Sequence, residues 1–214
     1  MSRRDDLSRV AIVGTSCAGK STLARELSRR LGAPHVELDA LYWGPNWTAR
    51  SAEEFWASVA EATAGPAWII DGNYIATRAL VLQRATTVIW LNYPLRTLLR
   101  RATSRTFRRL ATRECLFNGN REPLLGFLHA YWVPWQALQS YRPLRREYGA
   151  LLASDELAHL HIVEIRSVQE AERFLCGIER PETSVETSDR SANGALFEEP
   201  SRVAPRFEEP GANS

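Results

Sequence analysis

Short apolar runs alternate with amphipathic patterns along residues 9–176 of this 214-residue chain. The apolar runs lie at 9–13, 35–38, 67–70, 87–91 and 161–165. Patterns with helical spacing lie at 20–31, 51–64, 76–84, from 94 onward, and at 124–132, 136–153 and 168–176. Short continuous apolar runs suit strands buried on both faces, and strands that alternate with helices pair in parallel through right-handed crossovers. The pattern therefore predicts a three-layer α/β fold with a five-stranded parallel sheet.

Several helix boundaries are marked by particular residues. Ser51 and Glu54 form a capping-box pair that predicts the start of one helix. Gly32 is expected to end the first helix, and Pro94 suits the first turn of a long Arg-rich helix. We expect residues 114–123 to form a loop.

The residues that follow the first apolar run fit the pattern G-x-x-x-x-G-K-[ST] of a phosphate-binding loop. The spacing of Leu23, Leu27 and Leu31 predicts a helix after it, so the motif has the strand–loop–helix context that it requires. Glycines let the backbone turn tightly, and the helix N-terminus adds a partial positive charge. We expect Lys20 to reach the β- and γ-phosphates of a nucleotide and the Ser21 hydroxyl to bind Mg²⁺. The residues predicted to bind ATP are Gly14, Thr15, Ser16, Cys17, Ala18, Gly19, Lys20, Ser21 and Thr22.

The distribution of charge supports this interpretation. Lys20 is the only lysine of the chain, which otherwise uses arginine. A compact ammonium binds phosphate differently from a guanidinium, so lysine at this position favours a phosphate-binding loop over a glycine-rich turn before an ordinary helix. The net charge of +2 is uneven, because residues 180–214 hold four Arg and seven Asp or Glu. The positive charge therefore belongs to the part that is predicted to fold.

Two aspartates, Asp39 and Asp71, each follow a predicted strand. Ligands of parallel α/β sheets bind beyond the carboxyl ends of the strands, so both carboxylates are expected beside the phosphate loop. Asp71 is predicted to hold Mg²⁺ together with Ser21, the alternative being an Asp-Gly turn. Asp39 is predicted to position the acceptor or to accept a proton from its hydroxyl, the alternative being a turn or a helix cap. His35 begins its strand and is expected to be structural.

An aromatic stretch that also contains Gly and Pro comes directly after Asp39. Its Tyr42, Trp43 and Trp47 side chains either form a wall against which a base or an aromatic substrate stacks, or pack beneath a lid. The pattern leaves both interpretations open.

Seven arginines lie within 18 residues, without an acidic residue among them. They are Arg96, Arg100, Arg101, Arg105, Arg108, Arg109 and Arg113. Arg101, Arg105 and Arg108 share one helical face by their spacing. A stripe of like charge is destabilising unless an anion lies against it, and arginines stabilise phosphoryl groups during transfer. The stripe predicts phosphate contacts, with a solvated basic face or a nucleic-acid patch as alternatives.

The end of the chain differs in composition from the rest. Residues 180–214 are rich in Glu, Ser, Thr, Pro, Asn and Gly, and the segment 197–200 is repeated at 207–210. Low hydrophobicity and acidity predict a disordered solvated tail, or a short partner-binding motif, after a domain that spans 1–179. The three cysteines have no pair or metal spacing, and residues 1–8 lack the apolar segment of a signal peptide. We expect a cytoplasmic protein without a membrane span, whose oligomeric state stays open.

Three segments resemble the bacterial P-loop proteins called adenylate-kinase-like or DNA topology modulation proteins. They are Val-Glu-Leu-Asp-Ala-Leu-Tyr-Trp at 36–43 with Pro45 and Trp47, Trp-Ile-Ile-Asp-Gly-Asn-Tyr at 68–74, and the lid-like Gly-Asn-Arg-Glu at 119–122. The resemblance covers about residues 9–176. It implies a P-loop NTPase of the nucleoside-monophosphate-kinase fold, with ATP at the loop and a mobile helical lid at about 105–135. On this resemblance Arg101, Arg105 and Arg121 are candidate lid or catalytic arginines.

One difference from adenylate kinases concerns the acceptor. Those enzymes follow Asp-Gly with Phe-Pro-Arg, whose arginine holds the AMP phosphate, whereas here Asn73-Tyr74 follows and the next arginine is Arg78. The sequence predicts a phosphotransferase that uses ATP and Mg²⁺ and moves the γ-phosphate to a small-molecule acceptor that it does not identify. The alternatives are a nucleic-acid-associated ATPase or regulator and a nucleotide-sensing module that transfers nothing.

Overall fold

The computed structural model describes residues 6–112, 118 and 126–178, and for 106–112 and 126–137 it describes the backbone alone. The chain divides into two units, Met1–Pro181 and Glu182–Ser214, and every described residue belongs to the first. The predicted acidic tail lies outside the described residues. Within them, no helix has both the length and the apolar character that crossing a membrane requires.

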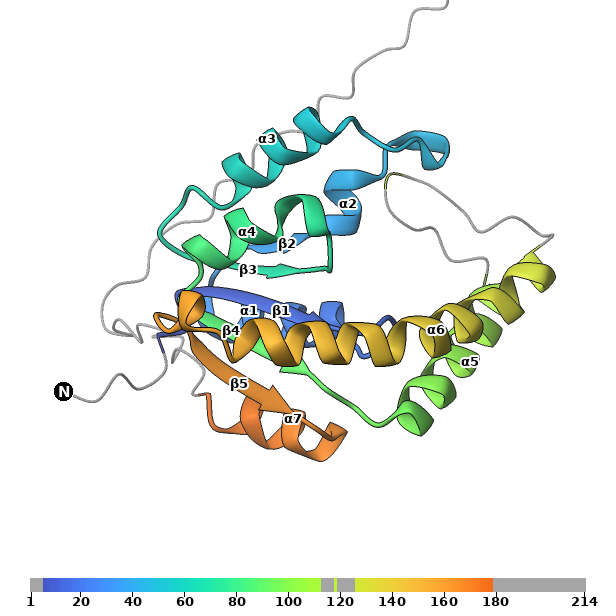
Figure 1. The fold of residues 1–214 in the computed structure, drawn as a ribbon. Coiled ribbons are helices and arrows are strands. Elements are labelled where there is room, and N and C mark those ends of the chain that lie inside the picture. Colours follow the sequence, from blue (N-terminus) through green and yellow to red (C-terminus); the bar gives the residue numbers. More distant parts are fainter. Residues whose placement is uncertain (1–5, 113–117, 119–125, 179–214) are drawn as a thin grey trace, which may run out of the picture. The chain divides into compact units, whose positions relative to one another are not determined.

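The strands and helices follow one another largely as the apolar pattern predicts (Figure 1). They are β1 (Arg9–Gly14), α1 (Lys20–Leu31), β2 (His35–Glu37), α2 (Leu38–Tyr42), the 3₁₀ turn η1 (Pro45–Trp47), α3 (Ala52–Ala62), β3 (Trp68–Asp71), α4 (Ile75–Arg84), β4 (Thr87–Leu91), α5 (Leu95–Thr112), α6 (Gly126–Leu152), the 3₁₀ turn η3 (Asp155–Leu157), β5 (His161–Ile165) and α7 (Val168–Cys176). The strands all pair in parallel in the order β2-β3-β1-β4-β5, which confirms the predicted five-stranded parallel sheet.

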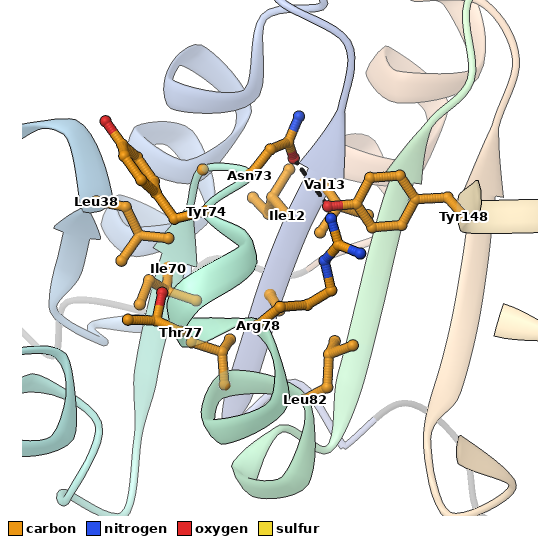
Figure 2. A pocket seen from close by; sticks show the side chains of 13 residues that line it. Ile12, Val13, Leu38, Ile70, Asn73, Tyr74, Thr77, Arg78, Leu82 and Tyr148 are labelled. Atoms are coloured by element: carbon orange, nitrogen blue, oxygen red, sulfur yellow. Dashed lines mark hydrogen bonds between the residues drawn. The ribbon is translucent and has the colours of Figure 1, made fainter. Parts of the chain in front are cut away.

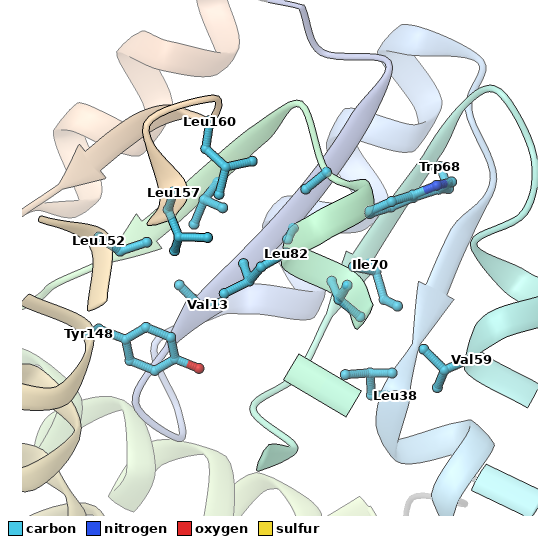
Figure 3. Packing of buried hydrophobic residues seen from close by; sticks show 14 of the residues in the cluster. Val13, Leu38, Val59, Trp68, Ile70, Leu82, Tyr148, Leu152, Leu157 and Leu160 are labelled. Atoms are coloured by element: carbon cyan, nitrogen blue, oxygen red, sulfur yellow. The ribbon is translucent and has the colours of Figure 1, made fainter. Parts of the chain in front are cut away.

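Helices cover both faces of this sheet, as three layers require. Ala11 and Val13 of β1 pack with residues from α3, α4 and α6 on one face (Figure 3). Val10 and Ile12 point the other way and pack with residues from α1 and α7. This alternation follows from the two-residue period of a strand. Because every residue of β3 is buried, its sequence is a continuous apolar run up to Asp71.

The predicted capping box is present at the start of α3. The Ser51 hydroxyl accepts a hydrogen bond from the Glu54 backbone N–H at 3.2 Å, and the Glu54 carboxylate accepts one from the Ser51 N–H at 3.1 Å. Such a cap stabilises a helix by about 1 kcal/mol.

The second strand is shorter than predicted. The apolar run 35–38 predicts a strand that Asp39 follows, but β2 ends at Glu37 and the chain turns into the short helix α2. In a helix, residues four apart share a face, so Leu38 and Tyr42 both pack against the same core cluster. Asp39 therefore lies in the first turn of a helix, where a negative charge is favourable.

The two helices predicted at 124–132 and 136–153 are one helix, α6, which continues through Pro134. A proline inside a helix removes one hydrogen bond and costs about 3 kcal/mol. Here α6 packs along α5 and buries Tyr148 and Leu152 against the sheet, and this packing offsets that cost. The predicted lid region, about 105–135, coincides with the end of α5 and the start of α6, which lie side by side (Figure 1), while 113–117 and 119–125 fall outside the described residues.

Candidate functional site

The phosphate-loop motif lies between β1 and α1, where the sequence places it. Gly14 has φ 143° and Gly19 has φ 93°, in the region that favours glycine. A Cβ atom on Gly14 would lie 2.6 Å from the Leu91 carbonyl oxygen, so neighbouring backbone leaves no space for a side chain there. The loop and the first turn of α1 together contain all nine residues predicted to bind ATP.

The N-terminus of α1 is open to an anion. Gly19 at its N-cap provides no side-chain hydrogen bond, and the first turn contains no acidic residue. The first N–H groups of a helix have no partner within the helix, and they carry a partial positive charge. Together with the loop, this end of α1 has the properties of a phosphate-binding site.

Lys20 is folded back over the loop. Its ammonium donates to the carbonyl oxygens of Gly14 at 3.0 Å and Thr15 at 3.3 Å. Burial lowers the pKa of Lys20, while the carboxylates of Asp71 and Asp39 act in the opposite direction. A half-buried ammonium whose partners are backbone carbonyls gains from a polyanionic ligand, because the ligand offers it stronger acceptors than two carbonyl oxygens.

Asp71 lies at the carboxyl end of β3, beside Ile12 of β1 and Glu37 of β2. Its side chain is buried, and among the described residues its Oδ2 atom has no hydrogen-bond donor. The Nε2 atom of His35 lies 3.6 Å from that oxygen. His35, expected to be structural because it begins its strand, is therefore a neighbour of the predicted Mg²⁺ ligand. The reason is that β2 is only three residues long, so its first residue is close to the carboxyl end of β3.

The donor set around Asp71 fits Mg²⁺ as kinases hold it. In the described part of the chain, no cluster of three or more His, Cys, Asp or Glu side chains is arranged to hold a metal by itself. Mg²⁺ bound with a nucleotide needs only one or two protein oxygens, because phosphates and waters complete its shell. The buried Asp71 Oδ2 atom, which has no donor among the described residues, is an oxygen of that kind, and the Ser21 hydroxyl in the first turn of α1 is the second one predicted.

Asp39 is exposed on α2 and is held by Tyr74. The Tyr74 hydroxyl donates to Asp39 Oδ1 at 2.7 Å. Burial, and then this hydrogen bond, raise the pKa of Tyr74 well above its ordinary value, so the hydroxyl stays protonated and keeps donating. Asp39 thus has a fixed orientation and a second oxygen with which it can accept a hydrogen bond from a ligand.

The aromatic side chains near Asp39 pack on one another. Tyr42 makes ring contacts with Trp43, Phe55 and Tyr74 at centroid distances between 4.8 and 5.2 Å. Trp43 lies edge-on to Trp47 at 5.8 Å. Tyr42 and Tyr74 also contact the apolar core, so these two rings connect the α2 segment that carries Asp39 to the core.

Two of the predicted arginines approach the loop from α5. Arg101 donates to the Ala18 carbonyl oxygen at 2.9 Å and lies 5.7 Å from the Tyr93 ring centroid. Arg105 is close enough to Lys20 for its charge to lower the pKa of that ammonium. Arg121 lies outside the described residues, as do the side chains of Arg108, Arg109 and Arg113, so the interpretation as a nucleic-acid patch stays a prediction.

The sequence did not indicate the contacts of three further residues near the site. Asn73 accepts a hydrogen bond from the Gly14 N–H at 3.3 Å and donates to the Gly14 carbonyl oxygen. The Tyr148 hydroxyl donates to Asn73 at 3.2 Å (Figure 2). Asn118 donates to the carbonyl oxygens of Ala40, at 3.3 Å, and Trp43, so it connects the α5–α6 region to α2. The signals for Asn73 in the sequence were its place two residues after Asp71 and its place in the resembling segment 68–74.

Arg78, the next arginine after the Asp-Gly pair, contacts α6. Its guanidinium is ion-paired with Glu147 and lies 5.1 Å from the Tyr148 ring centroid. The arginine that follows the Asp-Gly pair therefore binds α6.

Comparison with known proteins identifies no family. No family model matches the chain, and no curated protein does. Among solved structures, a gluconokinase from Sinorhizobium meliloti is 15% identical with a TM-score of 0.44, covering 81% of this chain and 94% of the other. A shikimate kinase from Acinetobacter baumannii in complex with shikimate is 19% identical with a TM-score of 0.46, covering 80% and 90%. A sugar kinase from Janibacter is 22% identical with a TM-score of 0.41, covering 78% and 91%.

These similarities are too distant to carry an argument about the site. The motif between the first strand and the first helix of a five-stranded parallel sheet defines the chain as a P-loop protein on its own evidence. The resemblance to DNA topology modulation proteins stays a prediction.

Proposed function

We propose that this chain is a phosphotransferase that uses ATP and Mg²⁺ and moves the γ-phosphoryl group to a small acceptor. The observation that carries the proposal is the position of Lys20. The ammonium of the single lysine of the chain donates to two carbonyl oxygens of the phosphate loop, and the charges of Asp71, Asp39 and Arg105 all act on its pKa. Such a convergence of one ammonium, two carboxylates and a guanidinium suits phosphoryl transfer better than a binding function alone.

Each residue has a role in this proposal. The loop amides and Lys20 hold the β- and γ-phosphates of the donor, while Arg101 and Arg105 neutralise charge from the α5 side. Ser21 and Asp71 would hold Mg²⁺, which supplies charge neutralisation on the phosphate oxygens when it is bound. Transfer then proceeds in line, without a covalent intermediate on the protein. The region of about 105–135 is proposed as a lid that excludes water.

Asp39 is proposed to position the hydroxyl of the acceptor. Its Oδ1 atom is held by Tyr74, which leaves the other oxygen to accept a hydrogen bond from an alcohol. The pairing of Arg78 with Glu147 argues against AMP, because the arginine that would hold its phosphate is engaged elsewhere. A small alcohol or another nucleotide fits better. We place such an ATP-dependent enzyme in the cytoplasm, which also suits the free thiols of Cys17 and Cys176.

The test is an ADP-release screen with nucleoside monophosphates, nucleosides and small alcohols as acceptors, each with Mg²⁺-ATP. The Lys20→Met variant is the blank, and Arg29→Met is the matched control, because it removes an exposed cation from the same helix. We expect acceptor-dependent release of ADP in the wild type and in Arg29→Met, and none in Lys20→Met. Equal activity in Lys20→Met would remove this lysine from the mechanism, and a wild type that binds no ATP would end the proposal.

A further inference from the structure

Asn73 holds Gly14, the first residue of the phosphate loop, from both sides. Its Oδ1 atom accepts from the Gly14 N–H, and its Nδ2 atom donates to the Gly14 carbonyl oxygen. The Tyr148 hydroxyl donates to the same Oδ1 atom, at 3.2 Å. This oxygen thus faces two donors while the nitrogen faces an acceptor, so the orientation of the amide is fixed by its partners. No other orientation of Asn73 satisfies all three contacts.

The Gly14 carbonyl oxygen accepts two hydrogen bonds, one from Asn73 Nδ2 and one from Lys20 Nζ. A carbonyl oxygen has two lone pairs, so both can be satisfied at once. When Lys20 moves to a phosphate, it gives up this carbonyl and the one of Thr15. Asn73 is the donor that remains on Gly14, which keeps the carbonyl from being left buried and unsatisfied.

We propose that Asn73 is a positioning residue of the phosphate loop that makes Lys20 available to the nucleotide. It fixes the backbone of Gly14 and retains a donor on the carbonyl that Lys20 leaves. Tyr148 acts through Asn73, by holding its amide in the orientation that does both. This inference rests on the proposed binding of ATP, and it adds two residues that the loop motif does not contain.

The position of Tyr148 supports its role. Its side chain is 1% exposed and belongs to the apolar core next to α4. The Arg78 guanidinium, itself paired with Glu147, lies across the Tyr148 ring (Figure 2). These contacts fix one part of α6, so the hydroxyl is presented to Asn73 with little freedom. The helix that returns from the predicted lid is thereby connected to the phosphate loop.

The first test is a double-mutant cycle on the affinity for Mg²⁺-ATP, measured with a fluorescent ATP analogue and by titration calorimetry. Asn73→Ala in the wild-type background is expected to weaken binding about tenfold, the effect of one buried carbonyl left without its donor. In the Lys20→Met background there is no lysine to release, so the same change is expected to cost less than about twofold. An equal loss in both backgrounds would mean that Asn73 only shapes the loop, and the inference would fail.

A second cycle covers the case in which Asn73→Ala does not fold or Lys20→Met binds too weakly to measure. Asn73→Asp keeps the acceptor for Gly14 N–H and Tyr148 but removes the donor, so it is expected to lose ATP affinity about tenfold as well. Tyr148→Phe removes only a hydroxyl and is expected to weaken binding about threefold in the wild type and not further in Asn73→Asp. Full affinity in Asn73→Asp, or additive losses with Tyr148→Phe, would overturn the inference. The proposed function fails separately, if the wild type binds no ATP.

Discussion

Gly72 joins the predicted Mg²⁺ ligand to the residue that holds the loop, and its environment allows a quantitative prediction. Its φ is 139°, and a Cβ atom added there would lie 2.7 Å from Leu38 Cβ and 2.9 Å from Leu38 Cδ1. Because Leu38 Cβ is attached to the backbone of α2, the clash cannot be relieved by a rotamer change. Gly72→Ala is therefore expected to cost about 4 kcal/mol of unfolding free energy, from about 1–3 of backbone strain and about 1–3 of overpacking.

Gly32 provides the matched control for this prediction. It also has a positive φ, 66°, but a Cβ atom there would meet nothing within 4 Å. Gly32→Ala is expected to cost only about 1–2 kcal/mol, for the left-handed conformation alone. Urea unfolding followed by tryptophan fluorescence would measure both variants, with unchanged m-values required for the comparison. Equal losses in the two variants would show that Leu38 does not confine Gly72 and would refute the argument.

Two further predictions concern the charged groups of the site. Tyr74→Phe removes the donor that orients Asp39, and we expect acceptor turnover to fall about tenfold with ATP affinity unchanged. The control is Tyr141→Phe, which removes an exposed hydroxyl on α6. Equal losses of turnover in the two variants would contradict this role of Tyr74. Burial lowers the pKa of Lys20 below its ordinary value of 10.5, so between the lowered pKa and 10.5 the unfolded chain binds more protons and the free energy of unfolding rises with pH. Relative to Lys20→Met, the nucleotide-free wild type should therefore gain stability as pH rises towards 10.5, and a constant difference would contradict the lowered pKa of the ammonium.

The phosphate loop and the sheet could be predicted because their signals are local. Strands buried on both faces are continuous apolar runs, and the loop requires glycine where Leu91 approaches Gly14. The predicted end of the second strand at Leu38 was wrong, because an apolar run does not show where a strand gives way to a helix. The choice between continuing the strand and turning into α2 depends on the core against which Leu38 and Tyr42 pack. The break predicted between the helices at 124–132 and 136–153 was wrong for a similar reason. The packing of α6 along α5 involves a distant part of the chain, so the residues around Pro134 do not reveal it.

The role of Asn73 depends on the order of the strands. Residues 14 and 73 are 59 positions apart, and nothing near either position predicts their contact. Once β3 is known to pair with β1, the register that sets Asp71 opposite Ile12 brings Asn73 opposite Gly14 two residues later. The contact could have been predicted from the sequence if the order of the strands had been known. A search for motifs cannot find it.

The two halves of the proposed reaction are supported differently by the fold. The donor half is built from the core: Asp71 and Tyr148 are buried, and Asn73 ties the loop to both of the elements that carry them. The acceptor half is open, because Asp39 is exposed and the Trp47 side chain after it is 36% exposed. A site that must bind the same triphosphate each time gains from rigid preorganisation, since its groups need not reorganise during transfer. In the proposed reaction, the identity of the acceptor depends on α2, on the turn that follows it, and on Asn118, which donates to the Ala40 and Trp43 carbonyl oxygens. The phosphate loop does not determine it, which is why the most specific motif of this sequence leaves the substrate open.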